Sequence, residues 1–333
     1  MKHANISLFV PHAGCPHQCS FCNQKTISGA VHELTPQAVT ETLEKACKDN
    51  LNPETTEIGF FGGSFTAINR EYMVSLLDAA KPYIEKGLFS GIRVSTRPDA
   101  IDREILSVLK EYKVTAIELG AQSTDEEVLL LNRRGHTRDH IINASELIKE
   151  YGFSLGLQMM TGLLGDTDEK SIKTCKDIIS LKPDTVRIYP TIVLEGTYLG
   201  DLYKKGEYTP QTLDEAVNLC SVLLKMFYDE NIKVIRLGLH SGGNVEEGYL
   251  LGPYHPAFGE LCQSKIYLNI LREKLKLKYP NGCNNTVTVY VNPKEISKMN
   301  GQKSANRKIL LEEGFSVAVK EKSTLNKYEI EME

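Results

Sequence analysis

ISLFVPHAGCPHQCSFC, residues 6–22, joins a short apolar run to three closely spaced cysteines. The apolar run at 6–10 is typical of a buried β-strand. Cys15, Cys19 and Cys22 follow it in the spacing C-x3-C-x2-C, which places three thiolates around a single loop. The stretch therefore predicts a strand that ends in a loop able to hold a metal centre.

The number of cysteines in this loop indicates the kind of centre. Iron–sulfur clusters are held by cysteine thiolates, and a closed four-iron cluster takes four of them. This loop supplies three, so one iron would stay open for another ligand. An open iron is what a cluster needs to bind S-adenosylmethionine (SAM) and to cleave it by reduction. The loop therefore predicts a [4Fe–4S] cluster on Cys15, Cys19 and Cys22, with SAM as the second cofactor.

Other uses of the three cysteines are weaker interpretations. A structural zinc site normally has four Cys or His ligands, and His12 or His17 could supply the fourth. An electron-transfer cluster of the ferredoxin type also takes four thiolates. The chain has 8 cysteines among 333 residues and no signal peptide, which indicates a reduced cytoplasmic protein rather than a disulfide framework. The cluster is the favoured interpretation, with zinc as the alternative.

Length, charge and hydropathy narrow the class of protein further. A chain of 333 residues can bury the core of one large domain with a small appendage. The formal net charge of -4 and the isoelectric point near 6.1 show no general excess of basic residues for nucleic acid. No apolar stretch approaches the roughly 20 residues of a membrane span. We expect a cytoplasmic globular protein with no membrane partner.

Short apolar runs alternate with amphipathic helical patterns along the chain. We expect strands at 6–10, 57–61, 92–95, 116–119, 154–159 and 185–189, with helices near 36–49, 70–86, 101–111, 137–151 and 168–181. A further helix near 210–230 and a strand at 233–237 add one more unit. Strands that alternate with helices predict a parallel sheet. The fold class is therefore α/β, a partial (β/α)6 TIM-like barrel over residues 1–260.

The pattern changes near residue 260, which suggests a second unit over 261–333. A helix at 260–278 precedes a strand at 286–291, a helix at 296–313 and strands at 316–320 and 327–331. This is a small C-terminal α+β domain, too short to hold a large enzyme domain.

Polar residues recur where the predicted barrel strands end. Taken singly, each has a structural interpretation: a Gly-Gly pair can be a turn, and a carboxylate within an apolar run can be an internal ion pair. In a parallel barrel, however, all carboxyl ends of the strands lie on one face, so their recurrence predicts one shared site. The residues concerned are Gly62, Gly63, Ser64, Ser95, Arg97, Glu118, Gln122, Arg134, His136, Gln158, Arg187, Tyr189 and Arg236.

These motifs carry a resemblance as a set. The cysteine loop, GGSFTA (62–67), STRPD (95–99), ELGAQS (118–123), NRRGHT (132–137) and QMMTGLLGD (158–166) resemble the Elongator catalytic-subunit-like branch of radical-SAM enzymes. The likeness is to a stand-alone bacterial form without an acetyltransferase domain, because no glycine-rich loop suited to coenzyme A follows Cys262. A more distant likeness is to oxygen-independent coproporphyrinogen oxidase, which shares the cysteine spacing.

The resemblance implies roles for the polar residues at the strand ends. Gly62, Gly63 and Ser64 would line the methionine end of SAM, although Ser64 stands where the superfamily often has an acidic residue. The ribose and carboxylate would be surrounded by Ser95, Arg97, Glu118 and Gln122, with Gln158 and Arg187 nearby. Phe21, just before the third cysteine, would shield an oxygen-sensitive cluster.

The resemblance also implies a reaction and partners. An external reductant of ferredoxin or flavodoxin type would supply one electron, and SAM would yield a 5′-deoxyadenosyl radical that abstracts hydrogen from a substrate. The locally basic segment NGQKSANRK (300–308) makes tRNA the favoured substrate. A small molecule such as a tetrapyrrole is one alternative. A non-catalytic iron–sulfur protein that binds RNA or a partner is another.

Overall fold

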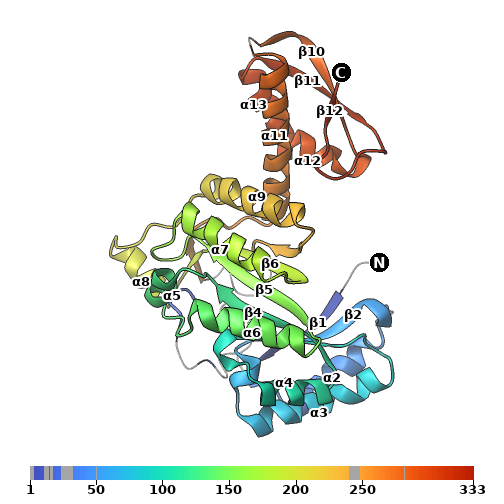
Figure 1. Cartoon of the computed structure of the whole chain (residues 1–333), viewed down its shortest axis with the longest axis vertical. Coiled ribbons are helices and arrows are strands. Elements are labelled where there is room, and N and C mark those ends of the chain that lie inside the picture. The colour runs from blue at the N-terminus through green and yellow to red at the C-terminus, as the bar shows by residue number, and fades with distance from the viewer. Residues whose placement is uncertain are drawn as a thin grey trace.

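A seven-stranded parallel sheet forms the larger part of the molecule, with strand order β1-β2-β3-β4-β5-β6-β8. The structure is a computed structural model that describes residues 4–10, 15, 18–23, 33–49, 51–239, 248–280 and 282–333. His12 and His17, the candidates for a fourth zinc ligand, lie outside the described residues. The sheet curls into part of a barrel (Figure 1), so the predicted α/β, TIM-like fold class is confirmed.

The strands and helices of the barrel alternate along the chain as expected. The strands are β1 (Ala4–Val10), β2 (Thr56–Gly62), β3 (Ile92–Thr96), β4 (Val114–Gln122), β5 (Ser154–Thr161), β6 (Thr185–Pro190) and β8 (Lys233–Leu237). The crossover helices are α2 (Pro36–Ala46), α3 (Arg70–Glu85), α4 (Arg103–Glu111), α6 (Arg138–Glu150), α7 (Asp168–Ser180) and α9 (Leu213–Asp229). Shorter elements that the sequence did not indicate are α5 (Glu126–Leu131), β7 (Val193–Leu194), α8 (Tyr198–Lys204) and β9 (Tyr249–Leu251).

Local capping explains where the helices begin. Thr35 accepts a hydrogen bond from the backbone amide of Ala38 and is followed by Pro36 in the first turn of α2. Thr167 accepts a hydrogen bond from the Lys170 amide at the start of α7. These caps satisfy amide groups that the first helical turn leaves without partners.

The two faces of the sheet differ in polarity. On the outer face, side chains pack with the crossover helices into one buried hydrophobic cluster, which includes Ile58, Phe60, Ile92, Val94, Ile117, Leu119, Leu155, Leu157, Val186 and Ile188. Successive strand residues point to opposite faces, so the residues between these lie on the inner face. That inner face carries polar side chains, and it is the surface on which a site can form.

Four charged side chains of alternating sign cross the inner face. Arg187 of β6 donates two hydrogen bonds to the Glu118 carboxylate of β4, at 2.7 and 2.8 Å. Arg93 of β3 donates to Glu118 at 3.2 Å and pairs with Glu57 of β2 at 2.7 Å. Burial alone would raise the pKa of Glu118, but the hydrogen bonds and charges of Arg187, with the charge of Arg93, hold it below its usual value.

The C-terminal unit gathers around the far end of a long helix, α11 (Phe258–Lys278), as Figure 1 shows. A three-stranded sheet places β10 (Cys283–Val291) between β11 (Phe315–Glu321) and β12 (Glu331–Met332). We propose the predicted boundary between residues 260 and 261 as the division between barrel and C-terminal domain, because this sheet is separate from that of the barrel.

Two predictions for the C-terminal unit are wrong. The helix expected at 296–313 is divided into α12 (Ile296–Asn300) and α13 (Ala305–Glu312), because Gly301, Lys303 and Ser304 have positive φ angles of 75°, 51° and 60°. The strand expected at 327–331 is reduced to β12, because Tyr328 also has a positive φ of 64°. The left-handed region interrupts both helix and strand.

Among the helices of the described residues, none combines the length and the apolar character that a membrane span requires.

We predict that Glu118→Gln destabilises the barrel by about 3–5 kcal/mol at neutral pH, because it leaves two buried guanidinium groups without their shared carboxylate. The folded-state pKa of Glu118 is lowered, so its stabilisation is complete above the unfolded value of about 4.3 and is lost as pH falls through the folded value. The difference between wild type and variant should therefore shrink in acid. Urea unfolding over a pH series measures both effects.

Glu150→Gln is the matched control for this prediction. Glu150 also pairs with an arginine, Arg103, at 2.7 Å, but both side chains are more than half exposed. Its removal should leave the free energy of unfolding nearly unchanged. An equal decrease in the free energy of unfolding of the two variants would contradict a stabilising role for the ion pairs of the inner face.

Candidate active site

One cavity of about 160 Å³ lies at the carboxyl edge of the sheet and brings together most of the predicted site residues. Its lining includes Cys15, Cys19, Cys22, Gly62, Gly63, Ser64, Ser95, Arg97, Gln122 and Gln158. Glu118 and Arg187 are not part of the lining, because they pair with each other deeper on the inner face. Phe21, Gln18, Thr96, Gly120 and Arg134 complete it.

The Gly-Gly turn joins the cysteine loop to the sheet. Gly62 has a φ of 108°, and a Cβ added there would lie 3.2 Å from the carbonyl oxygen of Val10. The amide of Gly63 donates to that same oxygen at 2.7 Å. The next amide, that of Ser64, is close enough to the Cys15 sulfur to oppose the rise that burial causes in the pKa of that thiol. Glycine is needed at position 62 because an L side chain would meet both an unfavourable φ and the end of β1.

The chemistry of the three thiols fits a metal centre. Burial raises the pKa of Cys22 to about 12, and the nearness of Cys19 and Cys15 adds to this shift. Burial also raises the pKa of Cys15, with a further contribution from Cys19. Thiolates crowded together repel one another, and bound metal cations remove that repulsion.

The spacing of the thiols also matters for the fit. In the part of the chain that the structure describes, no three His, Cys, Asp or Glu side chains converge on a point that could hold one ion. A cluster gives each thiolate its own iron, so its ligands can surround the cluster without meeting at one point. Three cysteines around one cavity therefore fit a cluster.

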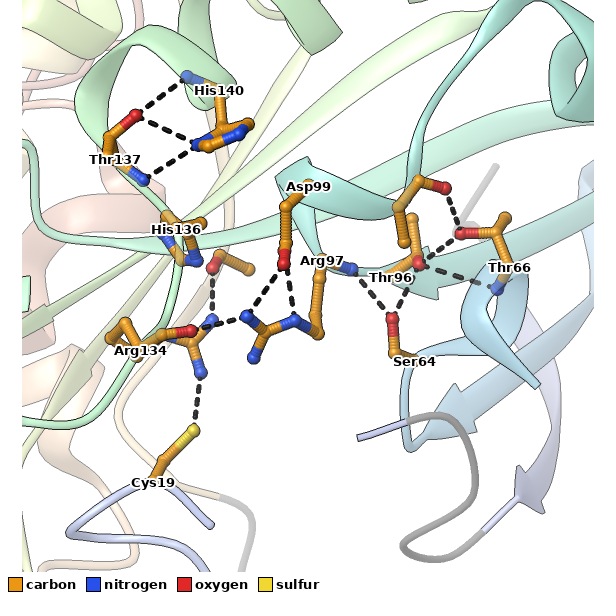
Figure 2. A network of polar contacts seen from close by, with 12 residues as sticks. Cys19, Ser64, Thr66, Thr96, Arg97, Asp99, Arg134, His136, Thr137 and His140 are labelled. Carbon is orange, nitrogen blue, oxygen red and sulfur yellow. Dashed lines mark hydrogen bonds and ion pairs between the residues drawn. The ribbon is translucent and has the colours of Figure 1, made fainter. Parts of the chain in front are cut away.

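Arg134 contacts the cysteine loop directly (Figure 2). Its guanidinium donates to the Cys19 sulfur at 2.9 Å and to the carbonyl oxygen of Gly120 at 2.6 Å. The Nε atom is buried and has no hydrogen-bond partner among the described residues. The sequence marked Arg134 as a polar loop residue without giving it a role, and the structure places it in the loop between α5 and α6.

Arg97 uses its Nε and Nη2 atoms within the protein. It donates to both carboxylate oxygens of Asp99 at 2.9 and 3.0 Å, and to the backbone carbonyl of Arg134. Burial alone would raise the pKa of Asp99, and the hydrogen bonds and charge of Arg97 lower it overall. Arg97 thus supports the loop that carries Arg134, as Figure 2 shows. Its predicted contact with the SAM carboxylate stays a prediction.

His136 follows Arg134 in the same loop and is buried (Figure 2). Burial, with the positive charge of Arg134, lowers its pKa to about 3, so the ring is neutral at physiological pH. One ring nitrogen lies 3.2 Å from the Ala121 carbonyl oxygen. His136 therefore supports the end of β4 rather than supplying charge.

A network of hydroxyl groups fixes the turn after β2. Ser64 lies 2.9 Å from the Thr96 hydroxyl, which in turn lies 2.6 Å from the hydroxyl of Thr66. The Ser64 hydroxyl also accepts from the Arg97 amide at 3.1 Å. Ser64 stands where the superfamily often has an acidic residue. Its side chain joins β2 to β3, as Figure 2 shows.

Gln122 and Ser95 present buried polar atoms without partners. A β-bulge interrupts the pairing of β4 with β5 between Gly120 and Gln122, and Gln122 has a positive φ of 64°. Its Oε1 atom and the Ser95 hydroxyl form no hydrogen bond among the described residues. Bulges often re-aim a side chain beside an active site, and an unpaired buried polar atom needs an explanation. Both residues line the cavity, so a polar ligand there would satisfy them.

Glu118, Gln158 and Arg187 form a neighbouring group. Gln158 lines the cavity and donates to Glu118 at 3.1 Å. The interpretation of Glu118 as an internal ion pair, which the sequence left open, agrees with its contacts. Its direct contact with SAM, and that of Arg187, remain predictions without a contact in this structure.

Asn132 anchors the cysteine loop and was not indicated by the sequence. Its Oδ1 atom accepts from the Ser20 hydroxyl at 2.6 Å, and its backbone carbonyl accepts from the Ser20 amide at 3.2 Å. The Nδ2 atom donates to the carbonyl oxygens of Val128 and Leu164. Ser20 and Asn132 are fully buried, so the segment between Cys19 and Cys22 is held to the end of α5.

A model of the Radical SAM superfamily matches residues 9–178, and a model of the Radical_SAM C-terminal domain matches residues 183–267. The chain belongs to the radical SAM superfamily. It is a radical-SAM enzyme, and the resemblance of its motifs to this class of enzyme is confirmed.

The chain is distantly similar to curated Elongator-type enzymes. The tRNA uridine(34) acetyltransferase of Methanocaldococcus infernus is 28% identical over 66% of this chain and 48% of its own length. Elongator complex protein 3 of Homo sapiens is 31% identical over 52% of this chain and 35% of its own length. The chain thus spans about half the length, or less, of these relatives.

Solved structures support the fold. The archaeal Methanocaldococcus infernus Elp3 with an N-terminal deletion has a TM-score of 0.62 at 23% identity, over 82% of this chain and 63% of that one. Coproporphyrinogen III oxidase from Escherichia coli has a TM-score of 0.50 at 16% identity, over 69% of this chain and 53% of that one. At these identities the likeness concerns the fold alone.

We predict that Asn132→Ala lowers cluster content, because the change leaves the buried Ser20 hydroxyl and the Leu164 amide without a partner, at a cost of about 1–3 kcal/mol. Iron content and visible absorbance after anaerobic reconstitution and gel filtration measure the effect. Ser20→Ala should lower iron content less.

Asn143→Ala is the control for this prediction, because Asn143 is exposed on α6, away from the cysteine loop. It should keep the iron content of the wild type. If Asn132→Ala also kept it, Asn132 would not be the anchor of the loop.

Proposed function

We propose that the chain binds a [4Fe–4S] cluster through Cys15, Cys19 and Cys22 and uses it to cleave SAM. The observation that carries this proposal is that three thiols of one loop line the same cavity as the glycine turn and the polar strand ends. When bound, such a cluster with one open iron supplies the electron that splits SAM into methionine and a 5′-deoxyadenosyl radical.

The residues of the chain provide binding, orientation and exclusion of water around that chemistry. Gln122 Oε1 and the Ser95 hydroxyl line the cavity and have no hydrogen-bond partner among the described residues, so they are suited to ribose hydroxyls or to the amino group of SAM. Arg134, which lines the cavity as Arg97 does, offers a positive charge for a carboxylate. Phe21 contributes an apolar wall, and its ring centroid lies 5.9 Å from the Arg134 guanidinium carbon. Holding SAM among fixed groups keeps the reactive carbon away from solvent.

We further propose that the substrate is tRNA and that a reductant of ferredoxin or flavodoxin type supplies the electron. Support comes from the relatives that are named tRNA uridine(34) acetyltransferases. A second support is local: Lys303, Arg307 and Lys308 are all exposed around the start of α13. Basic side chains neutralise backbone phosphates and give binding that depends on salt.

We predict that the anaerobically reconstituted protein contains about four irons per chain and, with dithionite and SAM, forms 5′-deoxyadenosine. Replacing Cys15, Cys19 and Cys22 together by Ala should abolish both, because no thiolate remains to hold iron. Iron assay, absorbance spectra and chromatography of the nucleoside products provide the measurements.

Cys47→Ala is the matched control, since Cys47 is exposed and outside the cysteine loop. It should leave iron content and product unchanged. Stoichiometric zinc in protein purified without oxygen would contradict the cluster. A cluster that is retained without any 5′-deoxyadenosine would favour the non-catalytic binding protein.

We predict that bulk tRNA binds at low salt and that its affinity falls steeply between about 50 and 200 mM salt. Lys303→Glu combined with Lys308→Glu should weaken binding to all sequences alike, because phosphate contacts do not read bases. The slope of log affinity against log salt should fall by about two. Fluorescence anisotropy with a labelled tRNA measures it.

Lys48→Glu combined with Lys86→Glu is the control, because it changes the same charge on exposed lysines of the barrel. If both double variants bound like the wild type, the basic segment would have no role in RNA binding. If the wild type bound no tRNA at low salt, the RNA substrate itself would be wrong.

A further inference from the structure

The last strand of the barrel sheet, β8, contains an irregularity that changes the direction of one side chain. Val186 pairs with Val234, but the next residue, Arg187, pairs with Arg236, so β8 has one extra residue. Val234 and Leu237 both pack against the hydrophobic core of the outer face. In a regular strand, residues three apart point to opposite faces. Val234 and Leu237 can both pack on the outer face because the bulge adds one residue between them. It turns Arg236 to the inner face.

Arg236 therefore lies among groups that face the inside of the barrel. Its register partner Arg187 is the side chain that holds Glu118. Tyr189 is two residues beyond Arg187 on the same face, and the charges of both arginines act on its hydroxyl. The Phe61 ring centroid lies 5.7 Å from the Arg187 guanidinium carbon. Arg187 is thus related to both aromatic rings, and Arg236 lies beside it and acts on one of them, Tyr189.

Without Arg236, the inner-face row of ion pairs has equal numbers of positive and negative charges. Glu57, Arg93, Glu118 and Arg187 alternate in sign and are joined by ion pairs. Arg236 brings one more positive charge beside Arg187, and no ion pair within the described residues involves it. The side chain is half-buried. A partly buried cation beside another cation is unfavourable unless an anion joins them.

The position of Arg236 relates it to the cavity. Gln158 lines the cavity and is the register partner of Arg187 on β5. Arg236 stands two strands from Gln158, which corresponds to about 10 Å at the usual strand spacing. An anion held there would place the rest of its molecule beside the cavity.

We propose that Arg236, together with Tyr189 and Phe61, binds a phosphate and the adjoining nucleoside of the substrate. This rests on the proposed function, since it names the part of the RNA that enters the barrel. Guanidinium groups match the geometry of phosphate oxygens. Aromatic rings stack against unpaired bases. The site is separate from the exposed basic segment around Lys303, which would contact RNA outside the barrel.

The test compares Arg236→Gln and Arg236→Lys with the wild type, using full-length protein reconstituted with cluster and SAM. The probes are a labelled anticodon stem–loop RNA, measured by fluorescence anisotropy, and uridine 5′-monophosphate, measured by calorimetry. Lys233→Gln is the matched control, because it removes the same charge from an exposed position of the same strand.

We expect Arg236→Gln to weaken the binding of both probes by about tenfold or more, as loss of a charged hydrogen bond to phosphate should. Arg236→Lys should keep part of the affinity, because it keeps the charge without the forked donors. Lys233→Gln should bind like the wild type. SAM binding and iron content should not change in any variant.

The possible failures are distinct. If the wild type binds both probes and Arg236→Gln binds them equally well, the phosphate site is overturned and the proposed tRNA substrate stands. If RNA does not bind but uridine 5′-monophosphate binds in a way that depends on Arg236, the site is supported and the RNA substrate is overturned. If neither probe binds the wild type, both proposals are overturned.

Discussion

The parallel pairing of β1 with β2 is the contact on which the candidate site depends. It runs in register from Ala4 with Thr56 to Val10 with Gly62, and the Gly63 amide extends it by one more hydrogen bond to Val10. Because the strands run in the same direction, the loops that follow them leave from the same edge. The cysteine loop and the glycine turn therefore face each other, and the Ser64 amide lies close to the Cys15 sulfur. A side chain at position 62 would meet the Val10 carbonyl and disturb this edge.

Regular pairing alone would not complete the site. The bulge in β8 brings Arg236 to the inner face, and the bulge in β4 lies directly before Gln122, which lines the cavity. In β8 one extra residue breaks the alternation of faces, so Arg236 leaves the side that the hydrophobic core would otherwise require. In β4 the positive φ of Gln122 is the local cost of the bulge, and the surrounding sheet maintains it.

The inner face remains polar because its charges are joined. Glu118 accepts hydrogen bonds from Arg93, Gln158 and Arg187, which come from three different strands. A buried carboxylate with several cationic and amide partners stays ionised, and its removal would leave the partners uncompensated. This arrangement explains why Glu118, which resembled a ligand contact at the end of an apolar run, serves to hold the strands that position Gln158 beside the cavity.

The sequence by itself determined the alternation of strands and helices in an α/β fold, and it predicts the cysteine loop as the centre of the candidate site. These features depend on short-range patterns: apolar runs of strand length, caps such as Thr35, and the C-x3-C-x2-C spacing. Only the tertiary structure decided the roles of Asn132, Arg134 and Arg236. Asn132 acts through Ser20, which is 112 residues away in the chain, and Arg134 reaches Cys19 across 115 residues. Bulges, likewise, depend on how two strands pair. The periodic pattern of a single segment contains no information on hydrogen bonds between distant residues or on shifts of register. Both depend on how the strands pair in the folded sheet.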